Sequence, residues 1–332
     1  MSRVLVTGGA GFIGSHVADA LMTRGHDVTI LDDLSGGFSD NVPAAATLVR
    51  GSVTDHALVD RVFADGRFEH VYHLAAYAAE GLSHFIKRFN YTNNVIGSVN
   101  LLDAAINTGA TTFVFASSIA VYGGRAAPPM TEETAGSPEA SYGVANDAVA
   151  LELRACRELF GLNYVVFRPH NVFGPRQNIG DRYRNVVGIF MNQILQGQPM
   201  TIFGDGTQTR AFSYIDDVAP MMAEAIDTPA CWNETFNVGA DQPYTLLQLA
   251  AAVAAAMGVA PQVTHLDARH EVQHAHSTHD KARRVFGARP QTSLEEGLDR
   301  MAAWVRLHGA RTSAPFDGIE ITKHLPASWR AR

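Results

Sequence analysis

Cysteine is scarce in this chain. The 332 residues include only two cysteines, Cys156 and Cys231. Two thiols cannot form the multi-disulfide framework on which small secreted domains depend, and their scarcity is typical of a protein in a reducing compartment. We therefore expect a cytoplasmic protein whose fold rests on a hydrophobic core.

Lysine is almost absent, so positive charge is carried mostly by arginine. The three lysines are Lys87, Lys281 and Lys323, and the formal net charge of the chain is −7. Proteins that bind nucleic acid attract its phosphates mainly through clustered lysine and arginine. The acidic balance therefore argues against nucleic acid as a partner.

Long hydrophobic runs are also missing. The longest alanine-rich run, residues 249–257, is too short to cross a bilayer, and the first residues enter a strand-like segment with no apolar signal stretch. This pattern predicts a soluble protein without a membrane segment. With 46% hydrophobic residues, the chain is long enough for one large globular unit or two coupled lobes.

The first half of the chain alternates short β-branched runs with amphipathic stretches, which predicts strands that alternate with helices. The expected strands are residues 4–6, 28–31, 47–50, 70–73, 112–116 and 164–167. Such alternation is typical of an α/β fold, here a Rossmann-type doubly wound parallel sheet in residues 1–172. From residue 173 on, segments interrupted by Gly, Pro and Asn predict a smaller C-terminal α/β lobe, residues 173–332, which interleaves with the first.

The segment "VLVTGGAGFIGSHVADALMTRGHDVTILDD" predicts a dinucleotide site. Gly8, Gly11 and Gly14 lie between a predicted strand and a predicted helix, where glycines allow a tight turn and a close approach of the backbone to a pyrophosphate. The same glycines could serve a tight turn alone, but the surrounding strand, helix and strand favour the cofactor. Asp32 follows where a carboxylate can bind ribose hydroxyls, and Asp33 adds negative charge that would repel a 2′-phosphate. The expected cofactor is NAD rather than NADP, although Asp33 could equally be a solvated turn residue.

Five motifs occur in the order found in one known family: "TGGAGFIG", "ASSIAVYG", "SYGVAN", "RPHNVFGPRQ" and "TRAFSYIDD". With them the chain resembles the extended short-chain dehydrogenase/reductases, specifically the NAD-dependent nucleotide-sugar epimerases and dehydratases. Within that family it is most similar to the UDP-glucose (UDP-galactose) 4-epimerases. The resemblance covers nearly the whole chain and implies NAD as cofactor, a UDP-sugar as substrate and a homodimer formed through residues 94–107 and 142–160, whose apolar faces could equally belong to the core.

The resemblance implies three catalytic positions. Ser118, preceded by Ser117, would hydrogen-bond the sugar C4 hydroxyl, and Tyr142 would remove and return the O4 proton. The family has Lys where this chain has Asn146, and that lysine lowers the pKa of the tyrosine and binds the nicotinamide ribose. Asn can donate a hydrogen bond but brings no charge. Three interpretations follow: a naturally altered enzyme, an engineered variant, or a degenerate NAD-binding protein.

The residues after Ser118 bear on the reaction. Dehydratases of this family have an Asp-Glu pair there and the related decarboxylases a Glu, whereas this chain has Ile119 and Ala120. Neither side chain can transfer a proton, so chemistry is expected to stop at C4. Asn171 and Asn178 stand where hexuronate epimerases tend to have Thr and Arg, which favours a neutral hexose.

The resemblance also implies the remaining binding positions. Substrate contacts are expected from Asn171, Asn185, Arg210 and Arg269, in addition to Ser117, Ser118 and Tyr142, although each arginine could equally be solvated. Contacts with NAD are expected from Gly8, Gly11, Phe12, Ile13, Gly14, Asp32, Asp33, Ser52, Val53, Leu74, Ala75, Ala76, Asn94, Tyr142 and Asn146. The family usually has Asp where Ser52 stands, so adenine recognition is expected to be weaker or to use the main chain.

The segment "HEVQHAHSTHD" contains a literal H-E-x-x-H metalloprotease pattern, His270 to His274. That zinc chemistry needs both histidines on one face of a helix. Here the segment follows a strand-like stretch and corresponds to a family loop that closes over the nucleotide. No metal site is expected.

Two classes of function remain open. The first is NAD-dependent 4-epimerisation of UDP-glucose and UDP-galactose, with activity impaired by Asn146; an N-acetylhexosamine or hexuronate nucleotide is an alternative substrate. The second is a non-catalytic protein that binds NAD or a nucleotide sugar.

Overall fold

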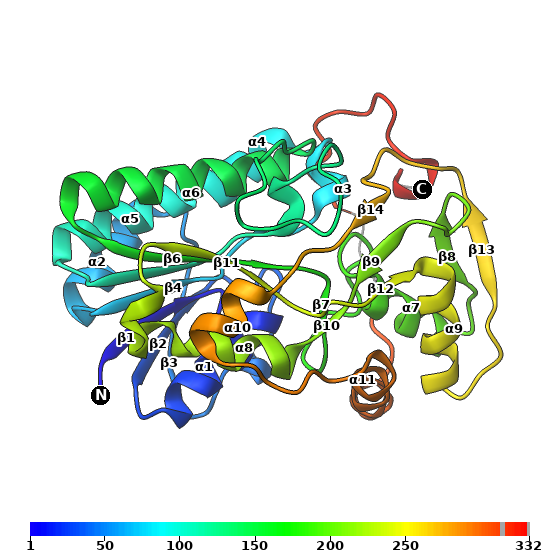
Figure 1. The fold of residues 1–332 in the computed structure, drawn as a ribbon, viewed down its shortest axis with the longest axis horizontal. Helices are drawn as coiled ribbons and strands as arrows, with labels where there is room; N and C mark the ends of the chain where they lie inside the picture. Colours follow the sequence, from blue (N-terminus) through cyan, green and yellow to red (C-terminus); the bar gives the residue numbers. More distant parts are fainter. Residues whose placement is uncertain (313–315, 331–332) are drawn as a thin grey trace.

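The computed structural model describes residues 1–312 and 316–330, so residues 313–315 and 331–332 of the predicted C-terminal lobe lie outside it. Seven parallel strands form the central sheet in the order β11-β6-β5-β4-β1-β2-β3 (Figure 1). They are β1 (Arg3–Thr7), β2 (Asp27–Asp32), β3 (Thr47–Arg50), β4 (His70–His73), β5 (Thr112–Ala116), β6 (Asn163–Pro169) and β11 (Glu234–Val238). The predicted α/β fold class is confirmed, and all six expected strands are present.

Helices cover both faces of this sheet, which explains why its strands are apolar on both sides. Along β1, Val4 and Val6 belong to one buried cluster and Leu5 to another, because successive side chains of a strand point to opposite faces. On the Leu5 side pack α2 (His56–Gly66), α5 (Gly97–Thr108) and α6 (Ser141–Phe160); on the other pack α1 (Phe12–Thr23), α8 (Ile215–Ala223) and α10 (Asp280–Phe286). The sheet is thus a middle layer between two helical layers.

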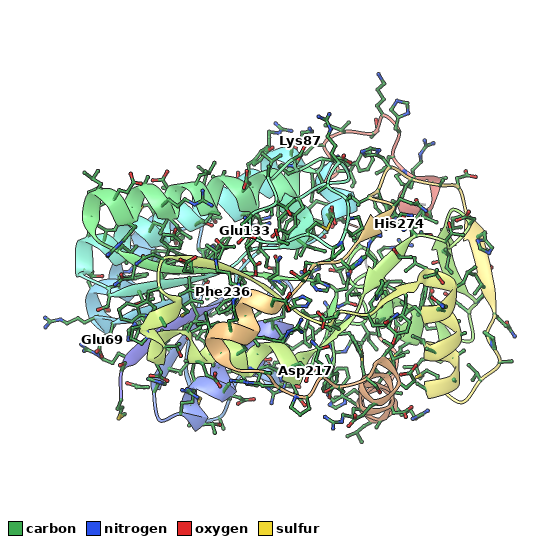
Figure 2. The ribbon with its side chains drawn as sticks, in the orientation of Figure 1. Glu69, Lys87, Glu133, Asp217, Phe236 and His274 are labelled. Carbon is green, nitrogen blue, oxygen red and sulfur yellow. The ribbon has the colours of Figure 1, made fainter. Side chains whose placement is uncertain are left out.

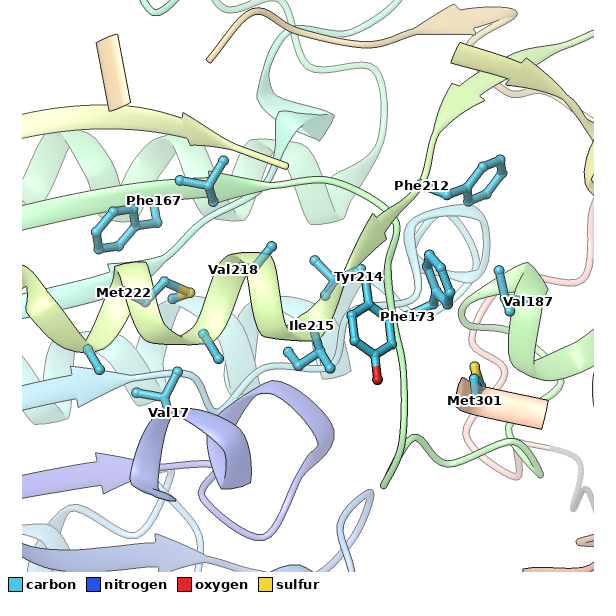
Figure 3. Packing of buried hydrophobic residues seen from close by; sticks show 14 of the residues in the cluster. Val17, Phe167, Phe173, Val187, Phe212, Tyr214, Ile215, Val218, Met222 and Met301 are labelled. Carbon is cyan, nitrogen blue, oxygen red and sulfur yellow. The ribbon is translucent and has the colours of Figure 1, made fainter. Parts of the chain in front are cut away.

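The seventh strand comes from the second half of the chain. β11 pairs with β6. α8 packs against α1, on the face of the sheet to which Val4 and Val6 point. Figure 3 shows Val218 and Met222 of α8 between Val17 of α1 and Phe167 of β6. Residues 215–238 therefore complete the central sheet and its helical layer.

The remaining elements form the smaller lobe. Its strands are β7 (Val172–Phe173), β8 (Met200–Phe203), β9 (Thr209–Ala211), β10 (Ser213–Tyr214), β12 (Pro243–Thr245), β13 (Val263–Leu266) and β14 (His274–Ala275), and its longer helices are α7 (Val186–Leu195), α9 (Leu246–Ala256) and α11 (Leu294–His308). The core runs without interruption from the sheet into this lobe, where Figure 3 places Phe173 and Tyr214 near Val187 and Met301. A shared core fixes the lobe against the carboxyl ends of the strands.

Two short helices complete the fold beside α6. They are α3 (Glu80–Ser83) and α4 (Lys87–Tyr91), and they follow the end of β4. A π-helical turn, Thr92–Ile96, then leads into α5. Among the described residues, no helix is long and apolar enough to cross a membrane.

Candidate active site

A large cavity opens at the carboxyl ends of the parallel strands, between the sheet and the smaller lobe. Its volume is about 1210 Å³. Its floor lies where β1 has β2 on one side and β4 on the other, the point at which strand order reverses and ligands of doubly wound sheets bind. The cavity is lined by these predicted site residues: Gly8, Gly11, Phe12, Ile13, Gly14, Asp32, Asp33, Ser52, Val53, Leu74, Ala75, Ala76, Ser117, Ser118, Tyr142, Asn171, Asn185, Arg210 and Arg269.

The glycine loop leaves no room for side chains. A Cβ on Gly14 would lie 2.1 Å from the carbonyl oxygen of Gly8, and Gly8 itself has φ of +72° and would place a Cβ 2.7 Å from the backbone N of Ala75. Gly11 precedes α1, and no side chain caps that helix. The first amides of α1 and the positive end of its dipole are therefore available to an anion, as a dinucleotide pyrophosphate requires.

Asp32, the last residue of β2, is held in place by hydrogen bonds with the backbone around it. Its carboxylate accepts hydrogen bonds from the backbone N–H groups of Ala10 (3.0 Å) and Leu34 (2.8 Å). Burial raises the pKa of Asp32, and those two amides oppose the shift. Asp32 thus ties the glycine loop to the strand while its carboxylate still lines the cavity.

Two buried polar side chains of the cavity wall have no hydrogen-bond partner within the described part of the chain. They are the hydroxyl of Ser117 and the amide of Gln177, whose side chains are buried. Buried polar groups are nearly always paired, by protein, water or ligand. These two groups, the glycine loop and Asp32 together fit a bound dinucleotide and a polar substrate.

Tyr142 occupies the first turn of α6, and its side chain is buried at the cavity wall. The backbone N–H of Tyr142 donates to Ser83 Oγ at 3.0 Å, which satisfies one of the amides left open at a helix start. Ser118, which follows β5, lines the same cavity, and its hydroxyl accepts a hydrogen bond from the N–H of Ala120 at 3.2 Å. The structure therefore brings the predicted serine and tyrosine to one cavity.

Burial raises the pKa of the Tyr142 phenol above its ordinary value. Hydrogen bonds from Asn146 and Ser118 lower that pKa, and the negative charge of Glu80 raises it further. Asn146 is itself buried, does not line the cavity, and donates from Nδ2 to the backbone carbonyl of Tyr142 at 2.9 Å. Asn146 is therefore a neutral hydrogen-bond donor at the position where the resemblance implies a lysine.

Asn94 also lies behind the cavity wall. Its Oδ1 accepts from the N–H of Tyr77 at 2.9 Å, and its Nδ2 donates to the carbonyl of Tyr77 at 3.2 Å and to Asn90 at 3.0 Å. With both ends of the amide engaged, Asn94 fixes the backbone after β4. Asn94 itself does not line the cavity.

The predicted substrate residues reach the cavity from the smaller lobe. Arg210 donates to the backbone carbonyls of Thr209 and Gln273, at 2.8 and 3.1 Å, and of Val272. Arg269 pairs with Glu271 at 3.0 Å, and its guanidinium lies 4.3 Å from the ring centroid of Phe203. These contacts hold both guanidinium groups at the cavity edge.

The two asparagines lie in tight backbone turns. Asn171 has φ of +43° and donates to the carbonyl of Ala211 at 3.0 Å. Asn185 has φ of +57° and donates from Nδ2 to the carbonyl of Val172. Asparagine tolerates this left-handed region better than most residues, so both positions have a structural reason for their identity as well as a place in the cavity wall.

The H-E-x-x-H segment is not helical. Figure 2 shows His274 on β14, and Glu271 bonds Arg269 and Gln208 rather than lying between two histidines. The two histidines thus do not share a helix face, which the zinc motif requires.

Several cavity residues escaped the sequence analysis. Glu80 begins α3, Arg184 stacks on Tyr77 with its guanidinium 5.0 Å from the ring centroid, and Trp329 packs against Arg269 at 5.5 Å. Of these three residues, Glu80 could have been noticed in the sequence, because it is a charged residue in the otherwise apolar stretch after β4. Arg184 and Trp329 lie in loops whose course the sequence does not reveal.

Comparisons with known proteins show the family of the chain. Residues 4–239 match the model of the NAD dependent epimerase/dehydratase family. The chain is 34% identical over 311 residues to the UDP-glucose 4-epimerase of Mycolicibacterium smegmatis, which covers 92% of this chain and 98% of that protein. It is 31% identical to UDP-glucuronic acid decarboxylase 1 of Xenopus tropicalis, over 92% of this chain and 72% of that protein.

Among solved structures, the UDP-glucose 4-epimerase of Thermotoga maritima with UDP-glucose superimposes with a TM-score of 0.88 at 34% identity, over 92% of this chain and 99% of that one. The matched segment contains the glycine loop, both serines of the site, Tyr142 and Asn146. The cofactor is NAD, which the glycine loop and Asp32 fit. By its sequence, its fold and its site, the chain belongs to the NAD-dependent epimerase/dehydratase family.

Proposed function

We propose that this protein interconverts UDP-hexoses that differ at C4, with UDP-glucose and UDP-galactose as the pair, through a 4-keto sugar. The observation that carries the proposal is the convergence of Ser118 and Tyr142 on a cavity that also contains the glycine loop. The similarity to UDP-glucose 4-epimerases supports the choice of sugar nucleotide.

The two side chains divide the work at O4. Ser118 holds the C4 hydroxyl by a hydrogen bond, and Tyr142 takes the O4 proton and later returns it. NAD supplies the redox capacity at C4 when it is bound. Because Tyr142 is buried and its pKa is raised, proton removal is expected to limit the reaction at neutral pH.

Arg210 and Arg269 are assigned to the diphosphate. Arginine forms charge-assisted, often bidentate hydrogen bonds with phosphate oxygens. Both groups line the cavity and come from the smaller lobe, and Arg210 also lines the small side cavity beside Ser118. A UDP-sugar bound there would point its hexose toward Tyr142.

Two alternatives keep a physical basis. The similarity to a UDP-glucuronic acid decarboxylase keeps a hexuronate substrate open, and an N-acetylhexosamine is a further option. The second alternative is a protein that binds NAD or a nucleotide sugar without turnover, because Asn146 brings no charge to Tyr142. Asn146 fits a naturally altered enzyme, an engineered variant or a degenerate protein.

We also propose a cytoplasmic homodimer. Both cysteines are buried and reduced, which suits a reducing compartment. On α6, Val144, Leu151 and Leu159 are exposed at spacings of seven and eight residues, and therefore form one apolar stripe. A second copy that packs against this stripe would bury it.

The test is the interconversion of UDP-galactose and UDP-glucose by the purified protein and by its Tyr142→Phe variant, followed by chromatography. The protein is expected to form the 4-epimer slowly, and the variant to lose at least about 100-fold of that rate because its proton acceptor is gone. Equal rates in both would rule out Tyr142 as the acid/base, and NAD binding without turnover of any UDP-hexose would favour the non-catalytic alternative.

A further inference from the structure

Glu80 is an acid in the wall of the main cavity. It lines the main cavity together with Tyr142 and Ser118. It also lines a side cavity of about 80 Å³ that opens beside Ser118, where His170 and Arg210 are its neighbours. A carboxyl group thus lies in the same space as the two groups assigned to the sugar C4 hydroxyl.

The position of Glu80 is fixed relative to Tyr142. The hydroxyl of Ser83 donates to the backbone carbonyl of Glu80 at 2.6 Å and accepts from the N–H of Tyr142 at 3.0 Å. One serine therefore joins α3 to the start of α6. The carbonyl of Ser141 is held as well, by Asn90 Nδ2 at 3.0 Å.

The carboxylate of Glu80 is not used by the protein. Within residues 1–312 and 316–330 it makes neither a hydrogen bond nor an ion pair, and its side chain is exposed toward the cavity. Acids that serve structure are normally paired or point into bulk solvent. An unpaired carboxylate that lines a deep cavity is available to a ligand.

Its surroundings suit a base. Although water in the cavity can reach Glu80, the surrounding protein partly desolvates its carboxyl group and so raises its pKa; Arg210 and Arg269 lower that pKa, and Glu271 and Glu139 raise it. A carboxyl group with a raised pKa is a stronger base than one in water, and proton transfer is most efficient when that pKa approaches the working pH.

The 4-keto sugar of the proposed function contains hydrogens that such a base could remove. Once C4 is a ketone, the hydrogens on the neighbouring carbons, C3 and C5, become acidic. Ile119 and Ala120 cannot remove them, which is why the sequence suggested that chemistry stops at C4. Glu80 enters the same site from a different segment of the chain.

We propose that Glu80 is a second proton-transfer group of this site, which removes and returns a proton at a carbon next to the C4 ketone of the bound hexose. The proposal rests on the proposed function for the ketone. The carboxylate takes the proton from carbon, and the C–H electron pair forms the double bond of an enolate whose negative charge lies on O4. Tyr142, which by then carries the former O4 proton, donates a hydrogen bond to that oxygen, as does Ser118.

Once the proton on Glu80 has exchanged with water, its return to the same face of the sugar places a solvent hydrogen on that carbon with the configuration unchanged. No oxidant or reductant is needed for this exchange. The site would therefore act at two positions of the hexose instead of one.

The experiment uses UDP-galactose and the NAD-loaded protein in D₂O, with the recovered UDP-hexoses analysed by mass spectrometry and NMR. Deuterium is expected at C3 or C5 at a rate that falls by about 100-fold or more in Glu80→Gln, which keeps the shape and hydrogen bonds of the side chain but not its basicity. Interconversion at C4 is expected to continue in that variant and to be faster at neutral pH, because the negative charge of Glu80, which raises the pKa of Tyr142, is gone. Glu133→Gln, a change at an exposed acid that lines neither cavity, is the matched control and is expected to behave as the parent.

The outcomes separate the two proposals. Interconversion at C4 with no deuterium on carbon would overturn the role of Glu80 and leave the proposed function intact. Exchange that is equally fast in Glu80→Gln would also overturn it. Absence of both interconversion and exchange would overturn the proposed function and, with it, this inference.

Discussion

The missing cation beside Tyr142 gives the sharpest prediction. A phenol has a pKa of about 10 in water, so only about one in a thousand is ionised at pH 7. Burial of Tyr142 reduces that fraction further, and Asn146 opposes the shift only as a neutral donor. The Asn146→Lys variant would place an ammonium group one helical turn from the tyrosine, where the family has its lysine.

The size of the effect follows from charge proximity. An opposite charge within about 4–6 Å lowers a pKa by roughly 1–3 units, and each unit corresponds to about 1.4 kcal/mol. The site of Asn146 is buried, so desolvation of the new ammonium will consume part of this gain. We expect kcat at pH 7 to rise by about 10- to 100-fold.

The pH dependence of the rate shows whether the pKa of Tyr142 is lowered or raised. The active form of Tyr142 as a proton acceptor is the phenolate, so a lower pKa moves the rising limb of the pH–rate profile to lower pH. Asn146→Met, of similar length to lysine but uncharged, is the matched control. It should show no gain in rate, and loss of the Asn146 hydrogen bond, which lowers the pKa of Tyr142, should move its rising limb to higher pH. The assay measures the conversion of UDP-galactose to UDP-glucose from about pH 6 to about pH 10, a range that ends near the ordinary pKa of a phenol. An Asn146→Lys variant with the parent rate and the parent pH profile would refute the reasoning.

Three further predictions concern the cofactor, the core and the assembly. Both carboxylate oxygens of Asp32 accept hydrogen bonds from backbone amides, and Asp32→Asn leaves only one acceptor oxygen. The Kd for NAD, measured by calorimetry, should therefore rise about tenfold or more. An unchanged Kd would contradict the assignment of Asp32 to the cofactor. His73 is fully buried and its pKa falls to about 3, so below about pH 6.5 the unfolded chain binds a proton that the folded protein does not. Urea unfolding should therefore show a free energy of unfolding that falls by up to about 2 kcal/mol between about pH 6.5 and about pH 5. The fall should be smaller in His73→Gln. Leu159 is 75% exposed on the apolar stripe of α6, so Leu159→Glu should yield a monomer by sedimentation, whereas a monomeric parent would contradict the dimer.

The sequence predicted the parallel sheet well because its strands are buried on both faces. Such strands read as continuous β-branched runs, and their ends are marked by turn residues. β11 (Glu234–Val238) escaped the prediction because it lies in the second half of the chain, after α8 and two short 3₁₀ turns and outside the strand-helix alternation of the first half. Its partner β6 lies about seventy residues earlier, and local patterns carry no information about such pairing.

The site was predictable where a motif fixes the backbone and less so where several segments meet. Gly8 and Gly14 could be assigned because nothing larger fits the loop. Asn94 could not be placed on a helix face, since the π-helical turn Thr92–Ile96 departs from the regular helical period. Glu80 was not predicted because it belongs to none of the motifs: it follows β4, whereas Ser117 and Ser118 follow the neighbouring strand β5.

The central claim is that Tyr142 and Ser118 serve a reaction in which C4 of a UDP-hexose is oxidised and reduced within one site. UDP-galactose labelled with deuterium at C4 tests it directly, with NMR of the UDP-glucose formed. The account predicts UDP-glucose that retains the deuterium at C4, because the hydrogen removed from that carbon returns to it. Product that has lost the label from C4 to solvent, or no product from the Asn146→Lys variant with NAD bound, would contradict the account.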